Sequence, residues 1–263
     1  MDVIVVTYNS LPWVERLLPT LGDVRTIVVD NASTDGTRDA MRRHDVELIE
    51  NTENRYLSPA WQQGLERSRS RYVTLLNPDC EVDTPGWADE LTAYLDEHPD
   101  VGIVGPRLLN ADGSVQHTVF PLATRRLALR IAVGLLLPQP VEPDSVQDVP
   151  VVSGACLVLR RAMLDEIGGI DVDYKLYWEE GDLCFRAWRA GWRVVYDPDV
   201  TLTHAGAHAT AEVDPADRSR LFTESRDHFY AKHFGRWFVG LLTLSHWAAL
   251  PYRILRRLSR VAF

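Results

Sequence analysis

Three clusters of polar and acidic residues have the composition of a site that could bind a metal ion, hold a phosphorylated ligand or move a proton. Asp30 ends an apolar run at 26–30, and Asn77-Pro-Asp79 follows another apolar run at 72–76. Glu179-Glu180-Gly-Asp182 places three carboxylates within four residues, at the expected start of a helix. Carboxylates of this kind bind hard divalent cations through oxygen or act as general bases.

Each cluster also has a purely structural interpretation. Asp30 could belong to a helix-capping turn, with Ser33 or Thr34 as the cap, and Asn77-Pro-Asp79 could be a solvated proline turn. Asp182 could pair with Arg186 four residues later in the same helix. Glu179 and Glu180 point in different directions, so one of them could face a cleft as a general base.

The segment 30–36 shares residues with a calcium-binding loop but is not one. A bidentate acid is required at the twelfth position of such a loop, where this chain has Arg42. An apolar run of the strand type also precedes the segment, where a helix is required. The sequence therefore excludes an EF-hand.

The first half of the chain alternates strand-like and helical patterns, which predicts an α/β protein with a doubly wound, mostly parallel sheet and helices on both faces. The predicted strands are 3–7, 26–30, 46–50 and 72–76. Ligands of such sheets bind at the carboxyl ends of the strands. Polar residues follow three of these strands, which places Thr7-Tyr-Asn9, Asp30-Asn31 and Asn77-Pro-Asp79 at one edge.

The second half of the chain does not continue the regular alternation of strands and helices. It contains strand-like runs at 101–109, 149–159, 192–196 and 200–204, and helical patterns at 161–167, 181–190 and 215–233. We expect one domain over residues 1–234, with a first half at 1–109 and a second half at 110–234. Residues 235–263 are expected to form an amphipathic helical appendage.

The composition narrows the class of protein. The chain has 263 residues, 46% of them hydrophobic and 25% charged, which is typical of a folded globular protein. Its formal net charge of −9 argues against nucleic acid as a partner. Three widely spaced cysteines provide no disulfide framework and are expected in or near the core. The first residues do not form a signal peptide, so we expect a cytoplasmic location.

The C-terminal segment combines basic and aromatic residues. Residues 231–263 contain six Lys or Arg and no acid, with Trp237, Trp247 and Tyr252 among leucines. Its longest uncharged stretch, residues 237–252, contains Ser245, His246 and Pro251 and falls short of the ~20 apolar residues that a spanning helix needs. It predicts peripheral binding to an anionic membrane surface, at the inner face of the plasma membrane. The alternative is a helix packed on the domain or on a second subunit in a homodimer.

The motifs occur in an order that resembles one family. Val-Val-Thr-Tyr-Asn (5–9), the segments 28–37 and 77–79, Ser-Gly-Ala-Cys (153–156), Trp-Glu-Glu-Gly-Asp (178–182) and His204 follow one another along the chain. As a set they resemble an inverting, family 2 glycosyltransferase of the GT-A fold, in its rhamnosyltransferase-like and galactofuranosyltransferase-like branches. The resemblance extends from Val3 to about Ala209. It implies that residues 1–109 are the nucleotide-binding half and residues 110–234 the acceptor-binding half.

The resemblance implies a nucleotide-diphosphate sugar as donor and a divalent metal, Mg²⁺ or Mn²⁺, as cofactor. Asn77-Pro-Asp79 stands where the family has its Asp-x-Asp sequence, which makes Asp79 the main metal ligand and His204 the second. The residues implied to contact the donor are Thr7, Tyr8, Asn9, Asp30, Asn31, Asn54 and Asn77.

On the acceptor side the resemblance makes Glu180 the catalytic base that deprotonates the acceptor hydroxyl. Gly154, Glu179, Asp182 and Arg186 are the residues placed near the acceptor, with Asp182 either binding it or positioning Arg186. The basic C-terminal segment favours a polyprenyl-linked or glycolipid acceptor, in cell-envelope polysaccharide or glycolipid synthesis. No covalent intermediate is required.

The sequence departs from the family pattern at two places. Tyr56 stands where a glycine is usual, and Glu180 stands where an aspartate is often found, which lengthens the base by one methylene. The expected donor is dTDP-rhamnose, with UDP-linked galactofuranose, glucose or GlcNAc as alternatives. The alternative from another class is a non-catalytic module that binds sugar nucleotides or glycans.

The loop after the first predicted strand excludes two other enzyme classes. A dehydrogenase requires Gly-x-Gly-x-x-Gly there, and a nucleotidyltransferase requires a glycine-rich loop with Arg and Lys to hold a triphosphate. The chain has Thr7-Tyr-Asn-Ser10 instead. Both classes are therefore excluded.

Overall fold

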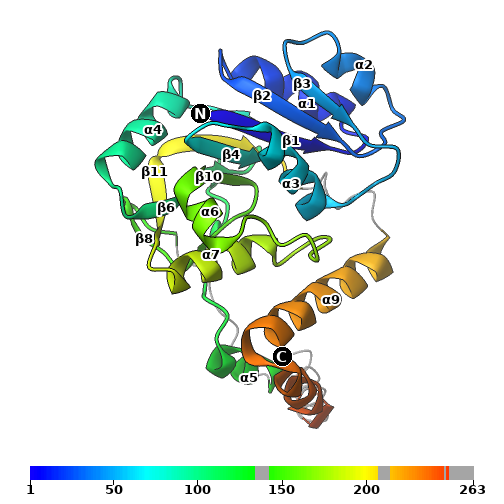
Figure 1. The fold of residues 1–263 in the computed structure, drawn as a ribbon, viewed down its shortest axis with the longest axis vertical. Helices are drawn as coiled ribbons and strands as arrows, with labels where there is room; N and C mark the ends of the chain where they lie inside the picture. The colour runs from blue at the N-terminus through cyan, green and yellow to red at the C-terminus, as the bar shows by residue number, and fades with distance from the viewer. Residues whose placement is uncertain (134–141, 207–213, 246, 249–263) are drawn as a thin grey trace, which may run out of the picture.

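The computed structural model of the chain describes residues 1–133, 142–206, 214–245 and 247–248. Its centre is a mixed sheet in the order β3-β2-β1-β4-β10-β6-β11-β5, with β8 paired to β11 (Figure 1). A separate pair is formed by β7 and β9. The strands are β1 (Asp2–Thr7), β2 (Arg25–Asp30), β3 (Glu47–Glu50), β4 (Tyr72–Leu76), β5 (Cys80–Val82), β6 (Val101–Leu109), β7 (Val119–Phe120), β8 (Gln147–Asp148), β9 (Val151–Val152), β10 (Cys156–Arg160) and β11 (Arg193–His204).

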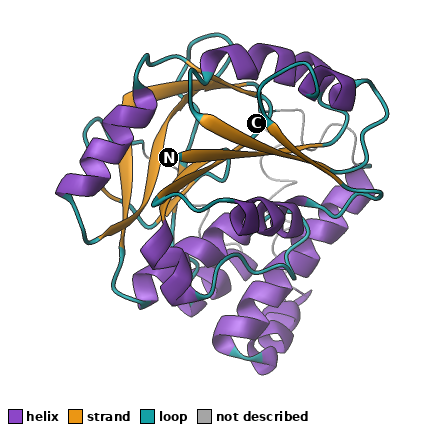
Figure 2. Ribbon diagram, turned by 45° about the horizontal axis from the view of Figure 1, so that its top comes forward, coloured by secondary structure: helices purple, strands orange, loops and turns teal. Residues whose placement is uncertain are grey.

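Helices lie on both faces of this sheet (Figure 2). One face is covered by α1, α2 and α4, and the other by α3, α6 and α7. On the second face Gly64 allows α3 to approach β1, because a Cβ there would overlap the Ile4 side chain. The helices are α1 (Leu11–Leu17), the 3-10 helix η1 (Leu18–Thr20), α2 (Thr37–Met41), α3 (Leu57–Arg67), α4 (Trp87–Glu97), α5 (Arg125–Ala132), α6 (Arg161–Ile167), α7 (Glu179–Arg189) and α9 (Pro215–Phe234).

The four strands β1 to β4 confirm the predicted α/β half. They are parallel, and β1 and β4 are buried along their whole length, as expected for apolar strands covered on both faces. Thr7 pairs with Asp30 at the carboxyl ends of β1 and β2. The polar residues that follow these strands therefore lie at one edge of the sheet, as the sequence predicted.

The second half contains strand reversals that the sequence did not reveal. The single run expected at 149–159 is wrong, because a turn at Ser153–Ala155 separates β9 from β10. Beyond the turn, β10 runs antiparallel between β4 and β6. The two runs expected at 192–196 and 200–204 are one strand, β11, with an irregularity between Asp197 and Thr201.

A third cluster of apolar residues joins α5, α7 and α9 to a helical segment at 236–245. Phe238 and Leu242 of that segment are buried in it. Trp237, Leu244 and Trp247 are each more than 60% exposed. The segment is therefore amphipathic, as predicted, and its inner face packs on the protein. Residues 249–263 of the predicted appendage lie outside the described residues.

Two further observations bear on the sequence predictions. All three cysteines are buried and free, as expected. Within the described ranges, no helix has both the length and the apolar character needed to cross a membrane.

Candidate active site

Asp30 holds the ends of β1 and β2 together. Its carboxylate is fully buried and accepts hydrogen bonds from Thr7 Oγ1 at 2.9 Å, from the Ser33 backbone N–H at 3.0 Å and from Ser33 Oγ. Arg38 Nε donates at 2.6 Å. Thr7 and Asp30 thus form the floor of the predicted donor site, and direct contact of either with a nucleotide stays a prediction. Arg38 carries no motif signal and was not predicted.

The loops after β1 and β2 interlock above this floor. The Asn9 backbone N–H donates to Ser33 Oγ at 2.9 Å, and Asn9 Oδ1 accepts from the Thr34 N–H at 2.9 Å. The predicted capping role of Ser33 or Thr34 is therefore wrong, because α2 begins later, after Gly36, and these residues bind the neighbouring loop instead. Tyr8 remains 41% exposed at the rim, where a ligand could reach its ring.

Asn31 orders the segment that follows β3. Its Nδ2 donates to the Tyr56 carbonyl at 2.9 Å, and its Oδ1 accepts from Asn51 Nδ2 at 2.9 Å. Asn54 Oδ1 accepts from the Tyr56 N–H at 2.8 Å, so Asn54 shapes the same turn. Asn51 was not predicted, although it directly follows a strand, which is the signal that could have identified it. Asn31 and Asn54 thus lie near the floor, where they were expected.

Backbone strain is concentrated around this edge. Five residues other than glycine have positive φ angles in the described part of the chain, and such conformations cost free energy for residues with a Cβ. Tyr56, at φ 65°, adopts the conformation that the usual glycine would take without cost. The five are Asn9, Ala32, Tyr56, Tyr177 and Trp178.

Asp79 and His204 meet beside the end of β4, although 124 residues of sequence separate them. Asp79 Oδ1 lies 3.3 Å from His204 Nε2, and the Asp79 side chain is almost completely buried. His204 Nδ1 lies 2.7 Å from Gln116 Oε1. That hydrogen bond requires the proton on Nδ1, which leaves the Nε2 lone pair facing Asp79. A carboxylate and an oriented imidazole fit a divalent cation such as Mg²⁺ or Mn²⁺.

Other groups near this pair already have partners within the protein. The Cys80 thiol lies in the same cluster, where burial raises its pKa well above the ordinary value and its Sγ donates to the Ala155 carbonyl at 3.6 Å. A second group, Asp171, Asp173 and His228, already has a cation from the protein, because Lys232 Nζ is 2.6 Å from Asp171. Gln116 was missed by the sequence analysis, because it is distant in sequence and follows no strand.

Glu179 and Glu180 lie in the first turn of α7 and are the acids most perturbed by burial. Oε2 of each is buried with no hydrogen-bond partner among the described residues. Burial raises the pKa of Glu180, and burial together with the Glu180 charge raises the pKa of Glu179 well above its ordinary value. A carboxylate with a raised pKa and a free oxygen is suited to accept a proton.

The turn at 153–155 connects this acid to the metal-binding side. The Asn77 backbone N–H donates to the Ala155 carbonyl at 2.9 Å. A Cβ on Gly154 would lie 3.5 Å from Glu180 Cβ and 3.6 Å from the Trp61 ring. Gly154 therefore faces Glu180, while the next residue contacts the loop that carries Asp79. The turn thus links the loop of Asn77 to Gly154 and Glu180, and the donor, acceptor and base roles of these three residues stay predictions.

Asp182 and Arg186 make contacts within the protein. Asp182 accepts from Arg186 Nε at 2.6 Å and contacts Lys232 Nζ at 2.8 Å and His233 Nε2 at 2.7 Å. Arg186 also donates to the Ile167 carbonyl at 2.9 Å. These contacts correspond to the positioning role considered for Asp182. A contact of either residue with an acceptor stays a prediction.

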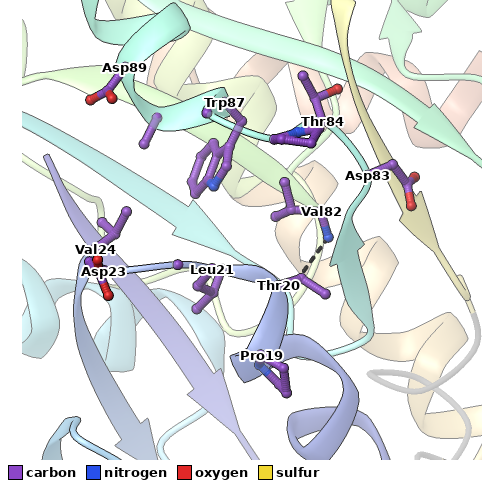
Figure 3. A pocket seen from close by; sticks show the side chains of 14 residues that line it. Pro19, Thr20, Leu21, Asp23, Val24, Val82, Asp83, Thr84, Trp87 and Asp89 are labelled. Carbon is purple, nitrogen blue, oxygen red and sulfur yellow. Dashed lines mark hydrogen bonds between the residues drawn. The ribbon is translucent and has the colours of Figure 1, made fainter.

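Two cavities differ in their relation to these residues. One of about 540 Å³ lies between the loop after η1 and the loop between β5 and α4, where Thr20 Oγ1 accepts from the Val82 N–H (Figure 3). None of the predicted site residues lines it. Another, of about 270 Å³, is lined by Glu180 and Gly181 together with aromatic side chains. The second cavity therefore borders the predicted base, Glu180.

The mixed sheet, the polar strand ends and the Asp79–His204 pair define an α/β protein with a candidate divalent-cation site beside the end of β4. Residues 2–168 match the family described as "Glycosyl transferase family 2". The chain belongs to this family and is a glycosyltransferase with the GT-A fold.

The chain is similar in sequence to a known rhamnosyltransferase and in structure to two solved proteins. The chain is 30% identical over 267 residues to an N-acetylglucosaminyl-diphospho-decaprenol L-rhamnosyltransferase of Mycobacterium tuberculosis, covering 90% of this chain and 86% of that protein. A mannosyltransferase of Pyrobaculum calidifontis, solved with GDP-Man and Mn²⁺, has a TM-score of 0.61 at 20% identity, covering 99% of this chain and 79% of that one. Staphylococcus aureus TarS 1-349 with UDP has a TM-score of 0.57 at 15% identity, covering 88% and 71%.

Proposed function

We propose that the protein transfers L-rhamnose from dTDP-rhamnose, with inversion, to a sugar diphospho-polyprenol acceptor in cell-envelope polysaccharide or glycolipid synthesis. The observation that carries the proposal is Glu180, whose buried Oε2 has no partner among the described residues. Glu180 lies beside Gly154, in the turn whose next residue is hydrogen-bonded to the loop that carries Asp79. The printed name of the mycobacterial relative supports the sugar and the acceptor class. The non-catalytic alternative is abandoned, because the chain belongs to a family of transferases.

On the donor side, the loops after β1 and β2 hold the nucleotide. Asp30 accepts from Thr7 Oγ1, and the Asn31 backbone N–H donates to the Thr7 carbonyl at 2.8 Å. Because Asn9 is also bonded to Ser33, the rim residues Tyr8 and Asn9 are preorganised for binding. Mg²⁺ or Mn²⁺ at Asp79 and His204 would supply positive charge near the donor diphosphate. Asn77 orients this side, since its backbone is bonded to Ala155.

On the acceptor side, Glu180 takes the proton of the acceptor hydroxyl. The freed oxygen lone pair forms the new bond to the anomeric carbon, on the face opposite the diphosphate. The bond from that carbon to the diphosphate oxygen breaks, and its electron pair leaves with the nucleoside diphosphate. Burial of Glu180 increases its basicity, because a carboxylate with a raised pKa holds the proton more tightly.

A membrane surface is the proposed location of the acceptor. Trp237, Leu244 and Trp247 are exposed on a segment whose opposite face is buried, which is the arrangement of an interfacial helix. The chain carries its excess of basic residues in this C-terminal region. We therefore propose that the protein docks peripherally on anionic lipid.

The donor is tested by thermal shift with dTDP-rhamnose and with UDP- and GDP-sugars, each with and without Mn²⁺. A ligand that binds only the folded state raises the melting temperature. We expect the largest metal-dependent shift with dTDP-rhamnose. A larger shift with a UDP-sugar would replace the rhamnosyl donor by the galactofuranosyl, glucosyl or GlcNAc alternative and leave the transferase assignment intact.

A further inference from the structure

Two cavities lie next to each other on the side of Glu180 that faces α5 and α9. The proximal chamber, of about 270 Å³, touches Glu180 and Gly181 and is otherwise largely apolar. The distal chamber, of about 510 Å³, lies between α5, α9 and the helical residues 236–245 and 247–248. Its walls include Ala128 and Ile131 of α5, Phe222 and Tyr230 of α9, and Leu242 and Trp247.

The two chambers share one wall. Ile131, Trp178, Phe222 and Tyr230 line both chambers. Ile131 is 38% exposed and Phe222 is 47% exposed, so the wall is open to a ligand and not sealed in the core. The route from Glu180 therefore passes over apolar side chains to Trp247, which is 66% exposed at the far end. In Figure 1, α5 and α9 lie side by side beyond α7.

Polar groups are found where the chambers meet. Trp178 Nε1 is buried with no hydrogen-bond partner among the described residues, which is costly unless a ligand oxygen satisfies it. Arg226 lines the distal chamber. Arg218 lies close enough to Tyr177 in the proximal chamber to oppose the rise in pKa that burial causes in the tyrosine. Arg226 also contacts Asp227 Oδ1 at 2.7 Å. The unpartnered N–H of Trp178, which lines both chambers, together with one arginine near each chamber, suits an anion.

We propose that the distal chamber binds the isoprenoid chain of the acceptor, and that the acceptor's sugar and diphosphate occupy the proximal chamber and the junction. The order of groups in the protein then matches their order in the ligand. A hydroxyl-bearing sugar lies at Glu180, an anion lies at Trp178 and the arginines, and a hydrocarbon chain lies between α5 and α9. This inference rests on the proposed function.

The chain supplies a matched pair of variants for a test. Trp247 lines the distal chamber, whereas Trp237 lines neither chamber. The two indoles are 66% and 63% exposed, respectively, so replacing either disturbs the fold little. Trp247→Ser and Trp237→Ser thus remove the same exposed apolar surface. Only the first removes a contact from the proposed chain site.

The experiment measures KM and kcat for N-acetylglucosaminyl diphosphates carrying two, three or four isoprene units, at concentrations where all are monomeric and without vesicles. The wild-type KM should fall as the chain lengthens, because each unit buries more apolar surface. Trp247→Ser should raise KM for the longest chain about tenfold, as expected for losing most of one buried side chain, with kcat and the shortest acceptor nearly unchanged. Trp237→Ser should leave all three KM values unchanged.

A second variant covers the case in which Trp247→Ser perturbs its own helix. Ile131→Asn changes α5 at the shared wall and should also flatten the dependence of KM on chain length. Two results would overturn the chamber assignment and leave the transferase assignment intact. One is a wild-type KM that is independent of chain length, and the other is an equal rise in KM in Trp247→Ser and Trp237→Ser. Absence of transfer to any of the three acceptors would instead refute the proposed acceptor, and the inference with it.

Discussion

Glu180 is the residue whose environment is most specific to the chemistry. Its raised pKa follows from burial in the first turn of α7, and its Oε2 has no partner among the described residues. A solvated structural acid would show neither feature. Where aspartate is often found in the family, glutamate extends the carboxylate by one methylene, and Gly154 leaves room beside it.

The first prediction concerns this carboxylate. Glu180→Gln should lower kcat by about a hundredfold to ten-thousandfold, because the amide accepts no proton, while the donor affinity stays within about twofold. The wild-type kcat/KM should rise with pH and level off above the ordinary glutamate pKa, because the base works ionised and its pKa is raised. Turnover in the glutamine variant close to that of the wild type would assign the base to another residue.

The second prediction concerns the partner of His204. Gln116→Leu removes the acceptor that fixes the imidazole, so the affinity for Mn²⁺ should fall by about tenfold to a hundredfold. Isothermal titration of Mn²⁺ in the presence of nucleoside diphosphate measures this. Gln147→Leu, at an exposed position on β8, is the control. Equal affinities in the two variants would show that Gln116 does not position the ligand.

Sequence reasoning located the polar residues at strand ends and missed their partners. Asp79 follows an apolar run at the end of a parallel strand, where ligands bind, and the resemblance to the family implied its role as a metal ligand. Gln116 and Arg38 could not be predicted, because their roles depend on distances between segments that only the folded chain sets. The backbone conformation of Tyr56 could not be predicted either, because a tyrosine in the sequence does not indicate a positive φ angle.

At the scale of elements, Asp182 joins α7 to α9. Its carboxylate is buried and contacts Arg186, Lys232 and His233. Although burial alone would raise its pKa, the hydrogen bond from His233 and the charges of Arg186 and Lys232 lower it far below the ordinary value. These contacts fix the helix that carries the base against the helix that lines the acceptor chambers.

The third prediction is that Asp182→Asn lowers the free energy of unfolding by about 3 kcal/mol near pH 7, because it leaves buried cations without their counter-charge. Since the folded pKa is depressed, this stability is present above the unfolded pKa of about 3.9 and is lost as pH falls toward the folded value. Urea titrations between pH 3 and 7 should therefore show a steeper loss in the wild type than in the variant. Parallel pH profiles would contradict the account.

The elements themselves were unequally predictable. The alternation of strands and helices to Leu76 predicted β1 to β4, because each buried parallel strand is a continuous apolar run. The turn at 153–155 was not predicted, because apolar residues lie on both sides of it and the hydrophobic pattern shows no clear break there. That turn reverses the chain into β10 and places Gly154 beside Glu180.

At the scale of the whole molecule, the exposed face of the 236–248 segment extends the acceptor side outward. Its inner face belongs to the third apolar cluster, so removing residues after Phe234 would expose α9 as well. Substitutions on the outer face therefore test membrane docking better than truncation does. A helix packed on the domain explains why Phe238 and Leu242 are buried. It does not explain why Trp237 and Leu244 are exposed.

The fourth prediction is that Trp237→Ser combined with Leu244→Ser lowers binding to vesicles containing anionic lipid by about tenfold or more, because both side chains lose the apolar surface they would bury. Vesicle flotation measures it. Val115→Ser with Val172→Ser, two exposed apolar positions elsewhere, should leave flotation unchanged. Equal flotation of both double variants would favour a segment that packs only on protein.

The measurement that tests the central claim most directly is the anomeric configuration of the product, determined by NMR after reaction with dTDP-rhamnose, Mn²⁺ and an N-acetylglucosaminyl diphosphate carrying a short isoprenoid chain. Direct attack assisted by Glu180 predicts a single rhamnosyl product with the configuration opposite to that of the donor, formed by the wild type and not by Glu180→Gln. A product that retains the donor configuration, or rhamnosyl transfer that is unaffected in Glu180→Gln, would contradict the account.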